Sequence, residues 1–521
     1  MTKPAPDASK SLEVELKFEL TRTHLRKLLN AKPFEALMTD KPKIKTLKAV
    51  YFDTPDLKLV EHGMSLRVRK ESHRYVQCCK RKAPHASSDG FARHEWQWRV
   101  KNLNLDVKLL KQCQGIMALP SDIKVDELSP LFSTRIKRQT RLLTLKNGAQ
   151  VRCDIDKGRI HADRGETKLC ELELELERGT VQDMLELARL ITSIVPARLS
   201  SRTKARRGFD LVQGTQGTWK KAQPLALPPN ATAHDVLSSS FIEGFKHLIA
   251  NEDCVLIQSH VEGVHQMRVS LRRMRALLST FKPQLPKGCY EDLSDHLKTA
   301  GLALSPARDL DVFIGEILFG VTSPHKEDQA ALEFMREKAL KHRTKAYKRA
   351  KALIHSEAYA HLLSEILHWF GSTPWIVQGK NPLARPASET AQNVLSCHHK
   401  HLLALGQEIA KMSSPQRHKL RIALKKARYA ALSFAPLYEN HQTSQYLRPL
   451  AALQDSLGHL NDLAMAQDII TGLRRGARGS NAKALKRASA LVEGWYDQAQ
   501  PDRERELQVA WGAFTKAKPF W

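Results

Sequence analysis

The segments EVELKFEL (13–20) and LCELELELE (169–177) alternate charged and apolar residues one by one. Side chains along a β-strand point to opposite faces in turn, so this pattern predicts strands with one charged and one apolar face. Five further segments alternate in the same way: MSLRVRK (64–70), RYVQCCK (74–80), RHEWQWRV (93–100), RLLTL (141–145) and AQVRCDI (149–155). Because the charged faces carry both signs, we expect residues 12–210 to form a closed antiparallel β-barrel with a polar interior.

The pattern changes after a short irregular stretch. Residues 212–233 contain three Pro and two Gly without periodicity, so we predict a linker at 211–233. From 234 to 515, apolar residues recur every three or four positions, which is typical of helices. The expected fold is therefore multidomain, with an N-terminal β-barrel of α+β type followed by an all-α domain.

Composition narrows the function classes. The 521 residues include 83 Lys and Arg against 55 Asp and Glu, a formal charge of +28, which favours a polyanionic partner. No run of 18 apolar residues predicts a membrane span, and the N-terminus lacks the apolar core of a signal peptide. The eight Cys form no CxxC pair, so we expect a reduced, cytoplasmic protein.

The helical region contains an internal repeat. The motif His-x-x-Arg-Val/Ile-x-x-x-basic-basic-x-Arg begins at His265 and again at His418. An acidic residue follows each His after the same 44 positions, at Asp309 and Asp462. Two copies with identical internal spacing predict a duplicated unit, built as two pseudo-symmetric helical bundles.

Each copy of the motif places basic residues on one helix face. At 100° per residue, the first copy's main cations fall within about 80° of one another. Like charges on one face repel, and a multivalent anion relieves that repulsion. The alternative is a solvated helix face, which would not require matched spacing. We therefore predict a polyanion-binding set, in which charge alone does not choose among nucleic acid, anionic lipid and polyphosphate: His265, Arg268, Arg272, Arg273, Arg275, His418, Arg421, Lys425, Lys426 and Arg428.

Acidic residues dominate the first and last predicted strands. Glu13 and Glu15 share one strand face, and Glu171 and Glu173 share another. A barrel brings these strands together, and clustered carboxylates suit Mg²⁺ or Mn²⁺. Taken alone, Glu-x-Glu is also typical of an edge strand kept soluble by charge. The Arg-x-Arg pair on another strand favours a metal-bound phosphate site instead.

The N-terminal region resembles the CYTH superfamily, also called triphosphate tunnel metalloenzymes. The resemblance covers about residues 12–210 and includes, in order, Glu-x-Glu-x-Lys, YFDTPDLKL (51–59), Arg-x-Arg, the terminal Glu strand and SRTKARRG (201–208). It implies metal ligands at Glu13, Glu15, Glu171 and Glu173. It implies a triphosphate path formed by Lys17, Arg67, Arg69, Lys80, Arg93, Arg138, Lys204 and Arg207. It implies catalytic roles for Lys17, Glu95 and Asp156. The sequence departs from the family pattern at Cys78, often Thr, and at Thr140, often basic.

The helical region, from about 234 to 515, is similar to the CHAD family, conserved-histidine α-helical domains that associate with inorganic polyphosphate. The resemblance rests on both His-x-x-Arg-basic motifs and on their downstream acidic motifs. The second of these has Asn461 where the family usually has Arg.

Together the resemblances imply an Mg²⁺- or Mn²⁺-dependent inorganic triphosphatase that hydrolyses tripolyphosphate to pyrophosphate and phosphate and binds long-chain polyphosphate. This implies a cytoplasmic protein, associated with polyphosphate granules and not with membranes. Three alternatives stay open: a thiamine, nucleoside or RNA triphosphatase or an adenylate cyclase of the same superfamily, a non-catalytic polyphosphate-binding scaffold, and a nucleic-acid-binding protein. The absence of closely spaced aromatic residues argues against the last.

Overall fold

The computed structural model describes all residues except 1–14, 72, 83–92 and 113–118. Two compact units form: residues 1–218 with 355–372, and residues 219–354 with 373–521. None of the described helices is long and apolar enough to cross a bilayer.

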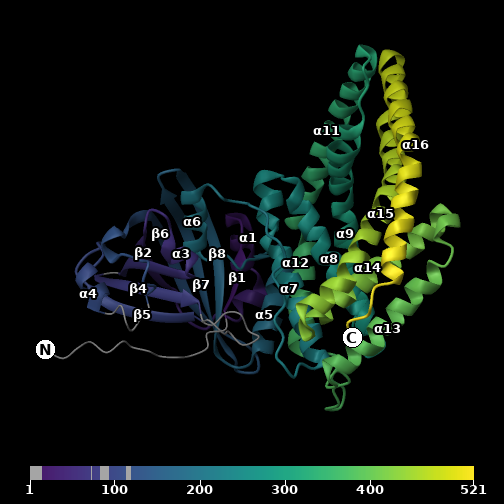
Figure 1. Ribbon diagram of the computed structural model, residues 1–521. Coiled ribbons are helices and arrows are strands. Elements are labelled where there is room, and N and C mark those ends of the chain that lie inside the picture. The colour runs from purple at the N-terminus through teal and green to yellow at the C-terminus, as the bar shows by residue number, and fades with distance from the viewer. Residues whose placement is uncertain (1–14, 72, 83–92, 113–118) are drawn as a thin grey trace. The chain divides into compact units, whose positions relative to one another are not determined.

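Unit 1 is built on one antiparallel sheet of nine strands (Figure 1). Along the sheet their order is β5-β4-β3-β2-β6-β7-β8-β1-β9. The strands are β1 (Glu15–Glu19), β2 (Lys43–Asp53), β3 (Met64–Glu71), β4 (Arg74–Lys82), β5 (Arg93–Val100), β6 (Ser129–Thr144), β7 (Gln150–Ala162), β8 (Gly165–Arg178) and β9 (Arg198–Leu199). The predicted β-type N-terminal region is thus confirmed, and the first and last acidic strands are direct neighbours, with Lys17 opposite Glu173.

Short helices complete unit 1. They are α1 (Arg22–Leu29), α2 (Lys32–Glu35), α3 (Lys58–Glu61), α4 (Val107–Gln112), η1 (Val125–Glu127), α5 (Val181–Ile194), α6 (Lys204–Gln213) and α12 (Glu357–Ser372). Helix α6 packs against β6 and β7. Gly208 permits this approach, because a Cβ there would lie 2.0 Å from Cε2 of Phe132. The close packing brings the first turn of α6, which begins at Lys204, to the interior of the sheet.

Helix α12 is the main departure from the expected domain division. The sequence places it within the helical region, but it packs against α5 of unit 1. Thr192 donates a hydrogen bond to Ser364 at 3.0 Å, and Arg189 forms an ion pair with Glu365 at 3.0 Å. An amphipathic helix can bury its apolar face against any matching face, so periodicity alone does not reveal its neighbour.

Unit 2 is helical throughout. Its elements are α7 (Ala233–Ala250), η2 (Cys254–Gln258), α8 (Val261–Phe281), α9 (Glu291–Val312), η3 (Phe313–Ile317), α10 (Leu318–Gly320), α11 (Lys326–Ile354), α13 (Ala387–Leu405), η4 (Ile409–Lys411), α14 (Ser414–Phe434), η5 (Ala435–Leu437), α15 (Asn440–Arg474) and α16 (Gly479–Thr515). Helix α8 packs against α7, α9 and α14, so the two repeat motifs lie on contacting helices. Helices α15 and α16 form a long hairpin that also contacts α11 (Figure 1).

Candidate functional site

A cavity of about 480 Å³ lies inside the sheet of unit 1, lined by strands β1 to β8 and by α6. Its ionisable lining comprises nine basic and six acidic side chains: Lys17, Arg67, Arg69, Lys80, Arg81, Arg138, Arg152, Lys204 and Arg206, with Glu15, Glu95, Asp154, Asp156, Glu173 and Glu175. The formal balance, nine minus six, is +3. Such a site attracts a polyanion while retaining carboxylates that suit a metal ion.

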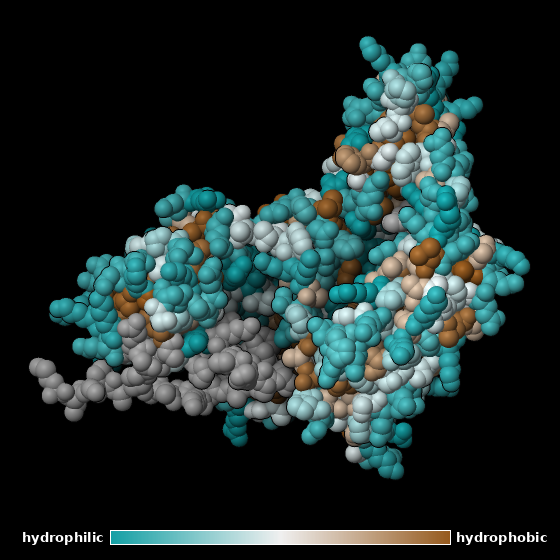
Figure 2. Space-filling model, viewed as in Figure 1, coloured by the Kyte–Doolittle hydropathy of each residue, from teal (hydrophilic) through white to brown (hydrophobic). Residues whose placement is uncertain are grey.

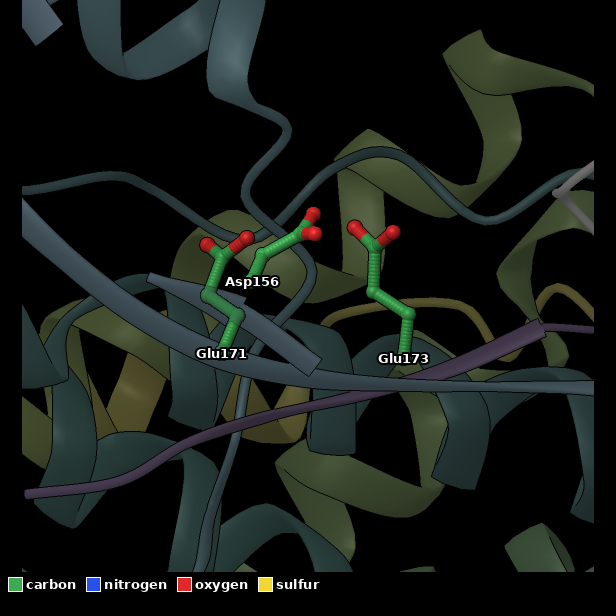
Figure 3. A group of neighbouring side chains, drawn as sticks. All are labelled: Asp156, Glu171 and Glu173. Carbon is green, nitrogen blue, oxygen red and sulfur yellow. The ribbon is translucent and has the colours of Figure 1, made fainter. Parts of the chain in front are cut away.

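Three carboxylates meet at one side of this cavity, of which two line it and the third, Glu171, is fully buried and outside the lining. Ligand atoms of Asp156, Glu171 and Glu173 all lie within 4.8 Å of one another (Figure 3). Strand register explains the meeting, because Asp156 of β7 is directly opposite Glu171 of β8. Glu171 and Glu173 are two residues apart on β8, so they point to the same face.

Four cations contact the carboxylate cluster: Lys17, Arg138, Lys204 and Arg207. Lys204 Nζ lies 2.8 Å from Asp156, 3.0 Å from Glu171 and 2.7 Å from Glu173. Lys17 Nζ lies 2.8 Å from Glu173, and the Arg138 guanidinium donates to both Asp156 and Glu173. Burial by itself would raise the pKa of Glu173, but Lys204, Lys17 and Arg138 outweigh it and hold that pKa far below its usual range.

The chemistry of this cluster fits a divalent cation. Glu171 is fully buried, and neither of its carboxylate oxygens accepts a hydrogen bond of good geometry, although Lys204 and Arg207 lie at ion-pair distance. A buried carboxylate with unused lone pairs is costly unless a cation satisfies it. Mg²⁺ and Mn²⁺ prefer oxygen ligands of this kind. Asp156, Glu171 and Glu173 are therefore the residues that could hold the ion.

A second group, on β3, β4 and β5, presents cations to the same cavity. Nε of Arg67 and Nε of Arg69 are buried and have no hydrogen-bond acceptor among the described residues. Burial lowers the pKa of Arg69, and the neighbouring Arg67 charge lowers it further. Two guanidinium groups with unused donors are suited to phosphate oxygens.

Glu95 is held in its ionised form within this second group. It pairs with Lys80 at 2.6 Å, directly opposite in the β4–β5 register, and accepts from Cys78 Sγ at 3.0 Å. Burial raises its pKa, but Lys80 and Cys78 more than offset that and bring the pKa to about 2. A carboxylate this acidic is a weak proton acceptor near neutral pH. Its geometry instead suits the positioning of Lys80.

The structure brings most of the predicted tunnel residues together. Lys17, Arg67, Arg69, Lys80, Glu95, Arg138, Asp156, Glu173 and Lys204 all line the cavity. Glu15 lines it too but is not part of the three-carboxylate group, since it lies opposite Glu175. Arg207 is outside the lining and pairs with Glu19 and with Glu171. Glu13 and the side chain of Arg93 lie outside the described residues.

Several ionisable cavity residues escaped the sequence analysis, among them Arg152 and Asp154 of β7. Arg152 and Asp154 alternate with Asp156 along β7, so all three face the interior. Arg138 donates to Asp154 at 2.7 Å, and Thr140 donates to its other oxygen at 2.5 Å. The period-two spacing of Arg152-Cys-Asp154-Ile-Asp156 was the available signal. Thr140, which departs from the family pattern, thus holds the carboxylate of Asp154 through a hydrogen bond.

In unit 2 the two basic motifs lie on α8 and α14, which are in contact. Arg272 Nε donates to the Tyr429 hydroxyl at 2.8 Å, and the guanidinium lies 5.6 Å from that ring. This contact joins the two repeats, because Tyr429 directly follows Arg428 of the second motif.

The first motif is partly buried against α9. Arg268 donates to the Gly301 carbonyl oxygen at 2.8 Å and to Ser305. Burial and the charge of Arg308 lower the pKa of His265. Burial raises the pKa of Asp309, while Arg268 and Arg308 oppose that rise. The side chain of Asp462 lies outside the described residues.

A nearby carboxylate that the motif search did not single out anchors α11. Asp311 accepts from Arg343 at 2.6 Å and from the Tyr347 hydroxyl at 2.8 Å. Its side chain is fully buried, so the contact holds α9 and α11 together. Its signal was the Asp-Leu-Asp sequence at 309–311.

Comparisons with known proteins match two separate regions of the chain to known domains. Residues 11–209 match the CYTH domain and residues 240–471 match the CHAD domain. The CHAD domain of Ricinus communis is 26% identical, with a TM-score of 0.51, over 58% of this chain and 98% of that one.

Two other comparisons found proteins whose names include a triphosphatase activity. An inorganic triphosphatase of Haemophilus influenzae is 25% identical over 159 residues, which are 30% of this chain. The match spans 44% of the length of that curated relative. A Hippeastrum protein named as an adenylyl cyclase with a dominant triphosphatase activity is 17% identical over 39% of this chain and 96% of that one, with a TM-score of 0.29. From both family matches and the two-part fold, this chain joins a CYTH domain to a CHAD domain.

Proposed function

We propose that the CYTH domain is a metal-dependent triphosphatase that hydrolyses tripolyphosphate to pyrophosphate and phosphate. The observation that carries the proposal is one cavity whose lining combines Asp156 and Glu173, which cluster with the buried Glu171, with the unused guanidinium donors of Arg67 and Arg69. A pure anion-binding site would not require three carboxylates beside its ligand. A triphosphate with a divalent ion requires both groups.

Asp156, Glu171 and Glu173 would hold the ion. When bound, Mg²⁺ or Mn²⁺ supplies neutralisation of charge on the phosphoryl oxygens. Lys17, Lys204 and Arg138 fix the orientation of the three carboxylates through the short contacts described above.

The remaining cavity residues bind and orient the substrate. Arg67, Arg69 and Lys80 hold phosphate oxygens, and Glu95 keeps Lys80 in place. The reaction breaks the P–O bond between the terminal phosphoryl group and the pyrophosphate leaving group and forms a P–O bond to water. Catalysis of such transfers depends mainly on positioning and charge stabilisation, which this cavity is built to provide.

The CHAD domain, in this proposal, binds long-chain polyphosphate through the basic motifs of α8 and α14. Support comes from the contact between the two helices and from the Arg272–Tyr429 hydrogen bond that joins the motifs. The domain would keep the enzyme close to stores of polyphosphate.

The test is phosphate release from tripolyphosphate, ATP and thiamine triphosphate, each with Mg²⁺, Mn²⁺ or EDTA. We expect metal-dependent turnover, fastest on tripolyphosphate. Glu173→Gln should reduce turnover by about 10²–10³-fold, because it removes a preorganised charge from the reacting centre. Glu166→Gln is the matched control, since Glu166 is exposed on the same strand, lies outside the cavity lining, and pairs with Arg159, which is outside it too. Faster turnover of ATP or thiamine triphosphate would refute the inorganic substrate, and no turnover of any would leave a binding scaffold.

A further inference from the structure

The turn between α15 and α16 is a second strongly basic surface, separate from the α8 and α14 motifs. From 469 to 492 the chain has six Lys and Arg and no Asp or Glu. Arg487 is paired with Glu327 and Asp328. The other five define the hairpin-tip surface: Arg474, Arg475, Arg478, Lys483 and Lys486.

The cations of the hairpin-tip surface are accessible to solvent. All five are exposed, and none forms an ion pair within the part of the chain that the structure describes. A hollow of about 280 Å³ lies between them, lined by Arg474, Lys483 and Lys486 with Ala477 and Ala482. Hydrophilic side chains cover this end of the hairpin (Figure 2). A basic hollow open to solvent is accessible to a large anion.

Fold stability explains only part of this arrangement: Arg474 and Arg475 end α15, where cations favour the helix dipole, but the other three cations lie at the start of α16. The first turn of α16 has no acidic residue, and Arg478, its N-cap, forms no side-chain capping hydrogen bond. Cations near a helix N-terminus oppose the helix dipole, and like charges close together repel. Each effect costs a few tenths of a kcal/mol, and a bound anion reverses both.

Chemistry favours inorganic polyphosphate as the anion. Residues 469–492 include no Phe, Tyr, Trp or His, so they offer no ring on which a nucleic-acid base could stack. The hairpin-tip surface can therefore recognise a ligand only by its charge, and polyphosphate is a polyanion without bases.

The position of the surface implies a long chain. Helix α14 connects through η5 to the first turn of α15, whereas Arg474 is the last residue of that helix. The 35 residues of α15 span about 50 Å at 1.5 Å per residue, and the 21 residues of α14, which packs against α15, span about 30 Å, so about 20 Å of α15 or more extends past α14. A tripolyphosphate cannot reach from the α14 motif to the hairpin tip, but a long polyphosphate can.

We propose that the hairpin-tip surface is a second binding site for inorganic polyphosphate, which lets the CHAD domain prefer long chains over short ones. This inference rests on the proposed polyphosphate binding by α8 and α14. Two sites on one chain act together through effective concentration, so losing one should weaken long-chain binding only.

The experiment measures affinities of the full chain for long-chain polyphosphate and for a short oligophosphate over a range of salt. The variant replaces Arg474, Arg478, Lys483 and Lys486 with Gln. The control replaces four exposed lysines of unit 1 that form no ion pair within the described residues, Lys101, Lys108, Lys146 and Lys168, and so removes the same charge.

We expect the tip variant to bind long chains about tenfold less tightly at low salt, with short-chain affinity unchanged. The slope of log K against log salt should become shallower by about 3, from four contacts at about 0.7 each. Equal losses in tip variant and control, or no loss in the tip variant, would overturn the inference. So would a loss of RNA or DNA binding without a loss of polyphosphate binding. If the unaltered protein binds no polyphosphate, the proposed function of the CHAD domain itself fails.

Discussion

Replacing Lys204 with Met should destabilise the CYTH domain by about 3–5 kcal/mol and make its stability depend on a divalent ion. The side chain of Lys204 is 12% exposed, and its ammonium contacts three carboxylates at 2.7–3.0 Å. Burial by itself would lower the pKa of Lys204, but the neighbouring carboxylates, Glu173 first among them, outweigh it and raise that pKa. Removing one partner from a buried ionic group leaves uncompensated charge, which costs about that much.

The assay is urea unfolding of the full chain with and without Mn²⁺, followed by the fluorescence of the Trp residues. Lys157→Met is the matched control, because Lys157 is exposed on β7, the strand that carries Asp156. Mn²⁺ at 100 times its Kd should restore about 2.7 kcal/mol, since it replaces the lost ammonium charge. A loss no larger than that of the control would refute the account of the ionic cluster. A full loss that Mn²⁺ does not reduce would refute the metal site.

Three further predictions concern other contacts. Gly208→Ala should cost about 1–3 kcal/mol and reduce turnover, because its Cβ would overlap Phe132 and push α6 outward; unchanged melting and kinetics would contradict this. The pKa of Glu95 is lowered to about 2, so its ionised form stabilises the fold above pH ~4.3, and this stabilisation is lost as the pH falls toward 2. In a pH series of unfolding curves, Glu95→Gln should therefore make the loss of stability in acid less steep. Tyr429→Phe removes the acceptor for Arg272, so the affinity for polyphosphate, measured by titration, should fall by about fivefold, equivalent to about 1 kcal/mol. An unchanged affinity would show that the Arg272–Tyr429 hydrogen bond does not contribute to binding.

The local patterns of the sequence were sufficient for much of the fold. Alternation at 13–20 and 169–177 predicted the strands whose described parts are β1 and β8. Strand β2 was not predicted, since Lys43–Asp53 begins with three lysines spread over six residues and ends in an apolar run. Its run of apolar residues packs inside the unit, where both strand faces are covered, so the period-two signal is lost.

The candidate site was predicted in part for the same reason. Glu171 and Glu173 followed from spacing on a single strand, which a sequence displays directly. Placing Asp156 rather than Glu15 beside them required the registers of β7 and β1 against β8. Register depends on how whole strands pair, and a shift of one residue would reverse which side chains face inward.

The sequence by itself determined the two-part division, the repeat of the helical region and the residue types of both basic motifs. Only the tertiary structure decided that Lys204 fits among three carboxylates, that Arg207 pairs outside the cavity lining, and that α12 packs with unit 1. Periodicity is a property of neighbouring residues and is readable along the chain. Charge pairing across strands and the choice of packing partner depend on contacts between distant segments, which no local pattern specifies.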